Sequence, residues 1–151
     1  MVIETRITWD RNLCLTFMQE VLRELLFCRN NVRNINFKLL ANYSPPTVIL
    51  YSYASKLACG AYSVEDMNNI FHKMWSENEK SKSSTWREMK GIEQALITFN
   101  EVYKYKNIKW YTDNQNCVKI LRSGSMKEQL QKLTFSIFSL CLQRCIYIDI
   151  Q

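Results

Sequence analysis

The sequence has few of the residues and patterns that mark unusual loops, zinc sites or membrane-spanning helices. Glycine and proline are scarce, three and two residues in a chain of 151, which leaves few loops of unusual geometry. It holds one histidine, His72, and no CxxC pair of cysteines, so we expect no zinc site. No apolar run comes near the ~20 residues of a membrane-spanning helix, so we also expect no membrane partner.

What is present is typical of one globular domain. Apolar residues make up 47% and charged residues 23% of the chain, both near the globular average. The net charge is +6 and the sequence pI is about 9.0, which favours a polyanionic partner. The excess of positive charge is spread along the chain, so we expect no basic tail that binds alone.

The cysteines indicate a reducing compartment. The chain shows no signal peptide and is long enough to build a core without disulfides. Cys141 and Cys145 lie one helical turn apart among apolar residues, where free cysteine behaves as a small hydrophobic side chain. We therefore expect reduced thiols and an intracellular protein, cytoplasmic or nuclear. The six cysteines lie at positions 14, 28, 59, 117, 141 and 145.

The rest of the chain is organised around residues 83–116, which predict a helix, a loop and a strand. The strand is indicated by Ile108, Trp110 and Thr112, which alternate with other residues at a period of two. Glu88 and Asp113 place one carboxylate at an end of each element, where α/β folds usually bind ligands. The helix is indicated by apolar residues at steps of three and four, which must be buried against a sheet, namely Met89, Ile92, Leu96, Phe99 and Tyr103.

The N-terminal part predicts a separate helical segment. Alternating residues in the first dozen positions allow a short strand, and Leu13–Arg29 has the apolar stripe of an amphipathic helix. Asn30–Pro46 is largely polar and ends in a Pro-Pro pair that continues neither a helix nor a central strand. We place the domain boundary there, with segments 1–46 and 47–151.

Three strands are predicted next, as a meander. Thr47–Tyr51 is an apolar, β-rich run that suits a central strand buried on both faces. Ala58–Val64 and Ile70–Ser76 follow as the second and third strands, with turn residues between them. The polar residues 77–84 then lead to the helix described above.

The C-terminal part completes an α/β fold with a mixed sheet. Asn114 or Asn116 caps a short helix, with Gly124 after its end. Ile146–Ile150 alternates as a closing strand. The long helix between them has an apolar stripe that consists of Leu130, Leu133, Ile137, Phe138, Cys141 and Cys145.

These residues carry a family resemblance. The run SSTWREMK (83–90), followed by WYTDNQN (110–116), resembles the ribonuclease H domain of reverse transcriptases from retroelements that integrate with a tyrosine recombinase. That family has a block YSDAS, then a glycine, then SSTWRE, then TDNQ. Here the first block is Tyr51–Ser55 and the glycine is Gly60, and the order matches over roughly residues 10–151. The resemblance implies a ribonuclease H-like fold, in which the N-terminal helix would connect to a polymerase domain and pack on it. An equally good alternative is that this helix packs on the sheet of its own chain.

The resemblance also implies which residues form the catalytic site. Family members hold two Mg²⁺ ions with an aspartate from the first strand, a glutamate from the first helix, an aspartate ending the fourth strand and usually a C-terminal acid. Glu88 matches the second position and Asp113 the third. Tyr53 replaces the first aspartate, and the chain ends at Gln151, so we expect a domain truncated before the last acid. A tyrosine phenol is uncharged at neutral pH and offers one weak oxygen ligand.

Each of these residues also has a purely structural explanation. Thr85 and Glu88 have the spacing of a capping box, and Asp113 with Asn114 suits a strand-to-helix turn. Asn114, Gln115 and Asn116 contact sugar or base edges of a substrate, or else cap the helix. We expect His72 to have a structural role or to lie at the surface, and Trp86 to be a packing anchor. Tyr53 either packs at the end of its strand or, in a binding role, stacks on a base or sugar.

Together these features predict a degenerate, non-catalytic ribonuclease H-like domain that still binds RNA/DNA hybrid, with at most one weakly held Mg²⁺. A reverse transcriptase polymerase domain is a second expected partner. One alternative is an active Mg²⁺-dependent nuclease completed by another acid, although Glu65 and Asp66 are too far from the strand ends. The other is a protein-interaction module formed by the sheet and the Leu13–Arg29 helix.

Overall fold

The structure is a computed structural model that describes residues 19–35, 46–66 and 68–151. The chain divides into two units, Met1–Asn42 and Tyr43–Gln151, and each is described by itself. None of the helices in the described ranges is long and apolar enough to cross a bilayer. The described cysteines are free thiols, with Cys59, Cys117 and Cys141 buried and Cys28 and Cys145 exposed.

The first unit contains helix α1 (Gln19–Ile35). The predicted end at Arg29 is wrong, because the helix continues through the two asparagines that follow. The Asn31 side chain donates a hydrogen bond to the Phe27 carbonyl, 2.9 Å away and one turn back, so this polar residue is accommodated within the helix. The first residues of the predicted helix and the predicted N-terminal strand lie outside the described residues.

The second unit is built on a five-stranded mixed sheet in the order β3-β2-β1-β4-β5. Strands β1, β2 and β3 form the predicted antiparallel meander, and β4 and β5 extend the sheet in parallel on the other side of β1. The prediction that the first of these strands is central is confirmed. The strands are β1 (Val48–Ala54), β2 (Ala58–Ser63), β3 (Ile70–Met74), β4 (Asn107–Thr112) and β5 (Tyr147–Ile150).

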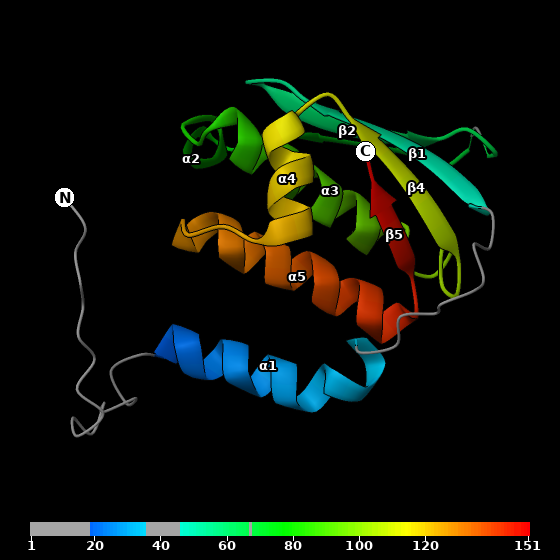
Figure 1. The fold of residues 1–151 in the computed structure, drawn as a ribbon. Helices are drawn as coiled ribbons and strands as arrows, with labels where there is room; N and C mark the ends of the chain where they lie inside the picture. Colours follow the sequence, from blue (N-terminus) through cyan, green and yellow to red (C-terminus); the bar gives the residue numbers. More distant parts are fainter. Residues whose placement is uncertain (1–18, 36–45, 67) are drawn as a thin grey trace, which may run out of the picture. The chain divides into compact units, whose positions relative to one another are not determined.

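Helices cover one face of this sheet (Figure 1). Helix α3 (Ser84–Thr98) lies against β1 and β2, and α5 (Glu128–Arg144) packs on α3. Helix α4 (Gln115–Ser123) contacts β4 and β5. A single turn, α2 (Glu77–Lys80), lies in the polar run that sequence reasoning left without an element.

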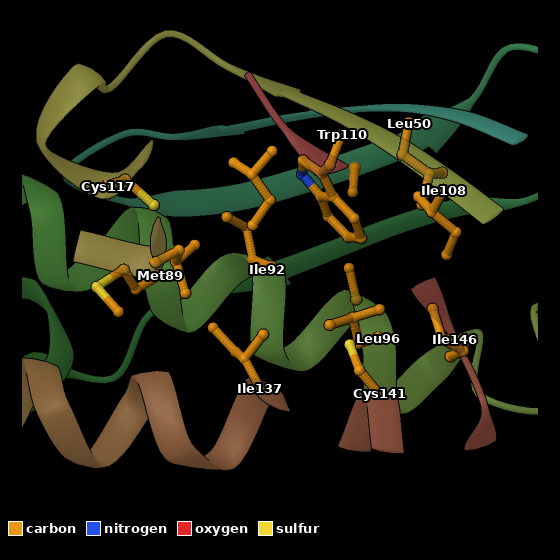
Figure 2. Close-up of a cluster of buried hydrophobic side chains, with 14 of the residues drawn as sticks. Leu50, Met89, Ile92, Leu96, Ile108, Trp110, Cys117, Ile137, Cys141 and Ile146 are labelled. Atoms are coloured by element: carbon orange, nitrogen blue, oxygen red, sulfur yellow. The ribbon is translucent and has the colours of Figure 1, made fainter. Parts of the chain in front are cut away.

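The core lies between the sheet and α3, and between α3 and α5 (Figure 2). The sheet contributes side chains from β1 and β4, and the predicted apolar stripe of α3 fills the space between them and α5. Phe99 and Tyr103 are buried as predicted but follow the last helical residue, Thr98. The fully buried side chains with the largest volumes are Trp110, Leu50, Met89, Ile92, Leu96, Ile108, Ile137 and Cys117.

Strand β1 is buried on one face only, so the prediction of burial on both faces is wrong. Val48 and Leu50 are buried, whereas Tyr51 and Tyr53, at the alternate positions, are exposed. The reason is that the helices of this unit pack on one side of the sheet. The other side of the sheet, called the open face here, carries Tyr51, Tyr62 and Tyr111 on adjacent strands.

The residues that cap α3 and α4 contradict one prediction and confirm another. The Ser83 hydroxyl, not that of Thr85, caps α3 by accepting a hydrogen bond from the Trp86 amide, so the Thr85 capping box is excluded. Asn114 caps α4 by accepting from the Cys117 amide at 3.0 Å, as predicted. Trp86 packs against the core with its ring 6.4 Å from that of Trp75, which confirms it as a packing anchor.

Candidate functional site

The candidate site lies where β1 and β4 end side by side. These strands are parallel and pair up to Ser52 and Thr112, so their carboxyl ends meet at one edge of the sheet. Tyr53 and Asp113 come directly after this last pair. Open α/β sheets bind ligands at this edge, because the chain leaves the sheet there and exposes side chains and backbone groups.

Glu88 reaches this edge from the first turns of α3 and is hydrogen-bonded to both strands. Its side chain is buried, with only 3% of the residue exposed. One carboxylate oxygen accepts from the Ala54 amide at 2.6 Å, and the other accepts from the Thr112 hydroxyl at 3.4 Å. The glutamate is therefore positioned by the ends of β1 and β4 together.

The pKa of Glu88 is raised from its ordinary value to about 7, chiefly by burial and in smaller part by the nearby negative charge of Asp113. Hydrogen bonds from Ala54 and Thr112 and the charge of Arg87 act in the opposite direction but are outweighed. Glu88 is consequently part protonated at neutral pH. It can act as a ligand or a base only in the fraction of molecules that carries the charge.

A hollow of about 460 Å³ joins the predicted site residues. Glu88 and Asp113 line it together with Tyr53 and the start of α4, where Asn114, Gln115 and Asn116 contribute. Asp113, Gln115 and Asn116 are exposed, and Asn114 is half-buried because its side-chain oxygen caps the helix. The structure thus brings together every residue that the sequence nominated, while their functional roles stay predictions.

A second, larger hollow of about 710 Å³ lies on the open face and shares Tyr53 and Asp113 with the first. Tyr53 is 60% exposed. The rings of Tyr51, Tyr62 and Tyr111, called the tyrosine row here, also line it. The tyrosine row was missed, because the pairing of β1 with β2 and β4 aligns these residues and that register is not visible in the sequence.

The described side chains that line the smaller hollow do not supply the set of ligands that a centre of two metal ions needs. Within the described ranges no group of three or more His, Cys, Asp or Glu side chains could hold a metal ion. His72 is exposed on β3, and Glu65 accepts from the Ile49 amide at the opposite end of β1. Glu88 and Asp113 are therefore the carboxylates that line the smaller hollow, and Tyr53 adds a phenol.

Two of the groups that position Glu88 were not anticipated, namely the Ala54 amide and the Thr112 hydroxyl. A backbone amide has no sequence signal. Thr112 did have one, since it precedes Asp113 on the buried face of a predicted strand, where a polar side chain needs a partner.

Comparison with solved structures identifies the fold as ribonuclease H-like. No protein-family model and no curated protein matches the sequence. Ribonuclease H1 from Halobacterium salinarum superposes with a TM-score of 0.54 at 16% identity, over 69% of this chain and 84% of that one. LC11 ribonuclease H1 in complex with RNA/DNA hybrid gives 0.54 at 11% identity, over 70% and 85%.

A reverse transcriptase contains a similar domain. The foamy viral protease-reverse transcriptase in complex with RNA/DNA hybrid gives a TM-score of 0.53 at 10% identity. The match covers 76% of this chain but only 19% of that one, so the likeness concerns one part of a longer protein. At these identities the comparisons establish the fold, a mixed five-stranded sheet with helices, and leave activity to be argued from the site.

Proposed function

We propose that this chain is the ribonuclease H-like domain of a reverse transcriptase from a tyrosine-recombinase type of retroelement, and that it binds RNA/DNA hybrid without cleaving it. The fold supports the class, and the blocks SSTWRE (83–88) and TDNQ (112–115) support the retroelement origin. The net charge of +6 suits a polyanionic ligand. The proposed function implies an intracellular location for the protein.

The observation that carries the proposal is the composition of the smaller hollow. Glu88, Asp113 and Tyr53 line this hollow together. The sequence resemblance assigns them to the positions of three family carboxylates. Hydrolysis by two metal ions requires carboxylates that converge on both ions and balance their charge. A neutral phenol does neither, so the hollow keeps its shape and its polar rim but loses the charge that the reaction needs.

Hybrid binding does not depend on the lost carboxylate. Proteins recognise A-form-like duplexes through shape, 2′-hydroxyl groups and phosphates, and such binding is sequence-tolerant and salt-sensitive. The exposed amides of Gln115 and Asn116 are suited to sugar and base edges beside the hollow. A reverse transcriptase polymerase domain, where present, would hold the same hybrid.

The decisive experiment measures Mg²⁺-dependent cleavage of a labelled RNA/DNA hybrid by the unmodified chain, Tyr53→Asp and Tyr53→Asn. We expect cleavage from Tyr53→Asp alone, because it restores a bridging carboxylate whereas Tyr53→Asn gives a side chain of the same size without charge. Adding Glu88→Gln to Tyr53→Asp should abolish the restored activity. Cleavage by the unmodified chain that Glu88→Gln removes would instead establish an active nuclease and contradict the proposal.

A second candidate function is a protein-interaction module. It is favoured by the exposed apolar side chains of the open face, which include Tyr62, Ile70 and Met74. This candidate predicts no effect of Mg²⁺ and no preference for RNA/DNA hybrid over DNA duplex at equal charge. Fluorescence anisotropy with the two duplexes, across a salt series, separates the candidates.

A further inference from the structure

Tyr53 differs from the tyrosines beside it because its ring is stacked on no other ring of the described residues. In the tyrosine row the Tyr51 ring stacks on Tyr62 and on Tyr111, with centroids 5.5 Å and 5.0 Å apart. The Lys109 ammonium lies 5.3 Å from the Tyr111 ring. Tyr53, by contrast, is 60% exposed, and its side chain has no aromatic or hydrogen-bonding partner among the described residues. The rings of the tyrosine row are therefore engaged with one another, whereas the exposed Tyr53 ring is available to stack on a ligand.

The groups around Tyr53 favour a nucleoside over a phosphate. None of the described residues that line the smaller hollow is a lysine or arginine, and two of them are the acids Glu88 and Asp113. A phosphate placed there would be repelled by the carboxylates. The amides of Gln115 and Asn116 instead offer donors and acceptors to the edge of a neutral base.

The carboxylate of Asp113 favours a ligand whose hydroxyl groups can donate hydrogen bonds to it. Asp113 is exposed at the rim of the hollow and accepts hydrogen bonds through its oxygens. A ribose 2′-hydroxyl is a donor that deoxyribose lacks, and it is the group by which proteins distinguish RNA from DNA. The volume of about 460 Å³ lies within the range of pockets that hold small molecules.

We propose that the smaller hollow binds one unpaired ribonucleotide at the end of a duplex. Its base stacks on the ring of Tyr53, its base edge contacts Gln115 and Asn116, and its 2′-hydroxyl donates to Asp113. This inference rests on the proposed function in taking nucleic acid as the ligand, and it adds what the site recognises. The substitution that removes a carboxylate from the cleavage position supplies the ring that holds an unpaired base.

The experiment measures fluorescence anisotropy in the presence of EDTA with three labelled probes. They are a blunt RNA/DNA hybrid, the same hybrid with a short single-stranded RNA extension, and the same hybrid with a DNA extension. The variants are Tyr53→Leu, Tyr53→Phe and Tyr147→Leu. Tyr147 is the matched control, because it is similarly exposed, at 68%, and pairs with Asn107 at the opposite end of the sheet.

We expect the unmodified chain to bind the RNA-extended probe more tightly than the blunt or DNA-extended probe. Tyr53→Leu should weaken binding of the RNA-extended probe about fivefold or more, the lower end of the effect of removing a base-stacking aromatic, and should abolish the preference for this probe over the blunt one. Tyr53→Phe keeps the ring, so it and Tyr147→Leu should stay within about twofold of the unmodified chain.

Equal binding of the RNA-extended probe by Tyr53→Leu and the unmodified chain would overturn this inference and leave hybrid binding intact. Equal affinity for the RNA and DNA extensions would overturn it as well. Failure of the blunt hybrid to bind, with Tyr53-dependent binding of the RNA extension preserved, would contradict the proposed function alone. Absence of binding to all three probes would overturn both.

Discussion

The two faces of the sheet are made by alternate residues of the same strands and have different tasks. On the covered face Leu50 and Trp110 are completely buried under α3, whereas on the open face their neighbours Tyr51 and Tyr111 keep contact with solvent and stack on each other. The covered face carries the free energy of folding. Tyr53 belongs to the exposed set, which explains how the fold accommodates a large aromatic side chain at this strand end.

The largest expected effect comes from breaking the covered face with Trp110→Ala. This change removes a fully buried ring and its hydrogen bond to the Ser52 hydroxyl, 2.8 Å away. We expect the free energy of unfolding to fall by about 3–5 kcal/mol, as for other buried aromatic residues. Urea unfolding followed by far-UV circular dichroism measures it.

The matched control is Tyr111→Ala, at the next residue of the same strand but on the open face. Its loss should be about 1 kcal/mol, because the ring is partly exposed and gives up mainly its stacking on Tyr51. Similar losses for the two variants would contradict the assignment of stability to the covered face.

The second prediction concerns Glu88, which reaches the candidate site from α3, the helix that packs on the covered face. Its pKa is raised to about 7 in the folded chain, so the folded state binds the proton more tightly than the unfolded state. Stability should therefore decrease as the pH rises from about 4.5 to 7 and stay lower above that. Glu88→Gln should be roughly 2 kcal/mol more stable than the unmodified chain at pH 8 and about equal to it at pH 5.

Glu79→Gln is the control for this pH dependence. Burial raises the pKa of Glu79, but hydrogen bonds from Ser76 and Lys73 outweigh it and lower the pKa overall. Ionised Glu79 therefore stabilises the folded state at pH values above its ordinary pKa, and this stabilisation is lost only in more acidic solution. Its removal should shift stability equally at pH 5 and pH 8. A Glu88→Gln variant whose difference from the unmodified chain is the same at both pH values would contradict the prediction.

The smallest effect is expected within the tyrosine row. Tyr51→Leu and Tyr62→Leu each remove one ring of a stacked pair on the open face. A double-mutant cycle for this pair should give a coupling energy of about 0.5–1 kcal/mol, the usual value for aromatic pairs. Thermal unfolding of the four proteins measures it. The pair Tyr51 and Tyr147, whose rings do not stack on each other in the described part of the chain, should give a coupling near zero.

Much of the fold could be predicted from local patterns. The apolar stripe of α3, the alternation in β4 and the cap at Asn114 depend on neighbours within a few residues, so periodicity and side-chain chemistry reveal them. The helix start was harder, because Ser83 and Thr85 are both good capping residues and only the backbone geometry selects Ser83. The end of α1 was missed because the polar run that begins at Asn30 was placed outside the helix, whereas the Asn31 side chain bonds back to the helix.

The sequence by itself determined the order of the elements and the identity of the acids and the tyrosine at the strand ends. Only the tertiary structure decided that β1 has an open face, that the Tyr53 side chain is exposed, and that Glu88 is hydrogen-bonded to both Ala54 and Thr112. These features depend on strand register and on the side from which helices pack. Both are set by contacts between residues far apart in the chain, which no local pattern encodes.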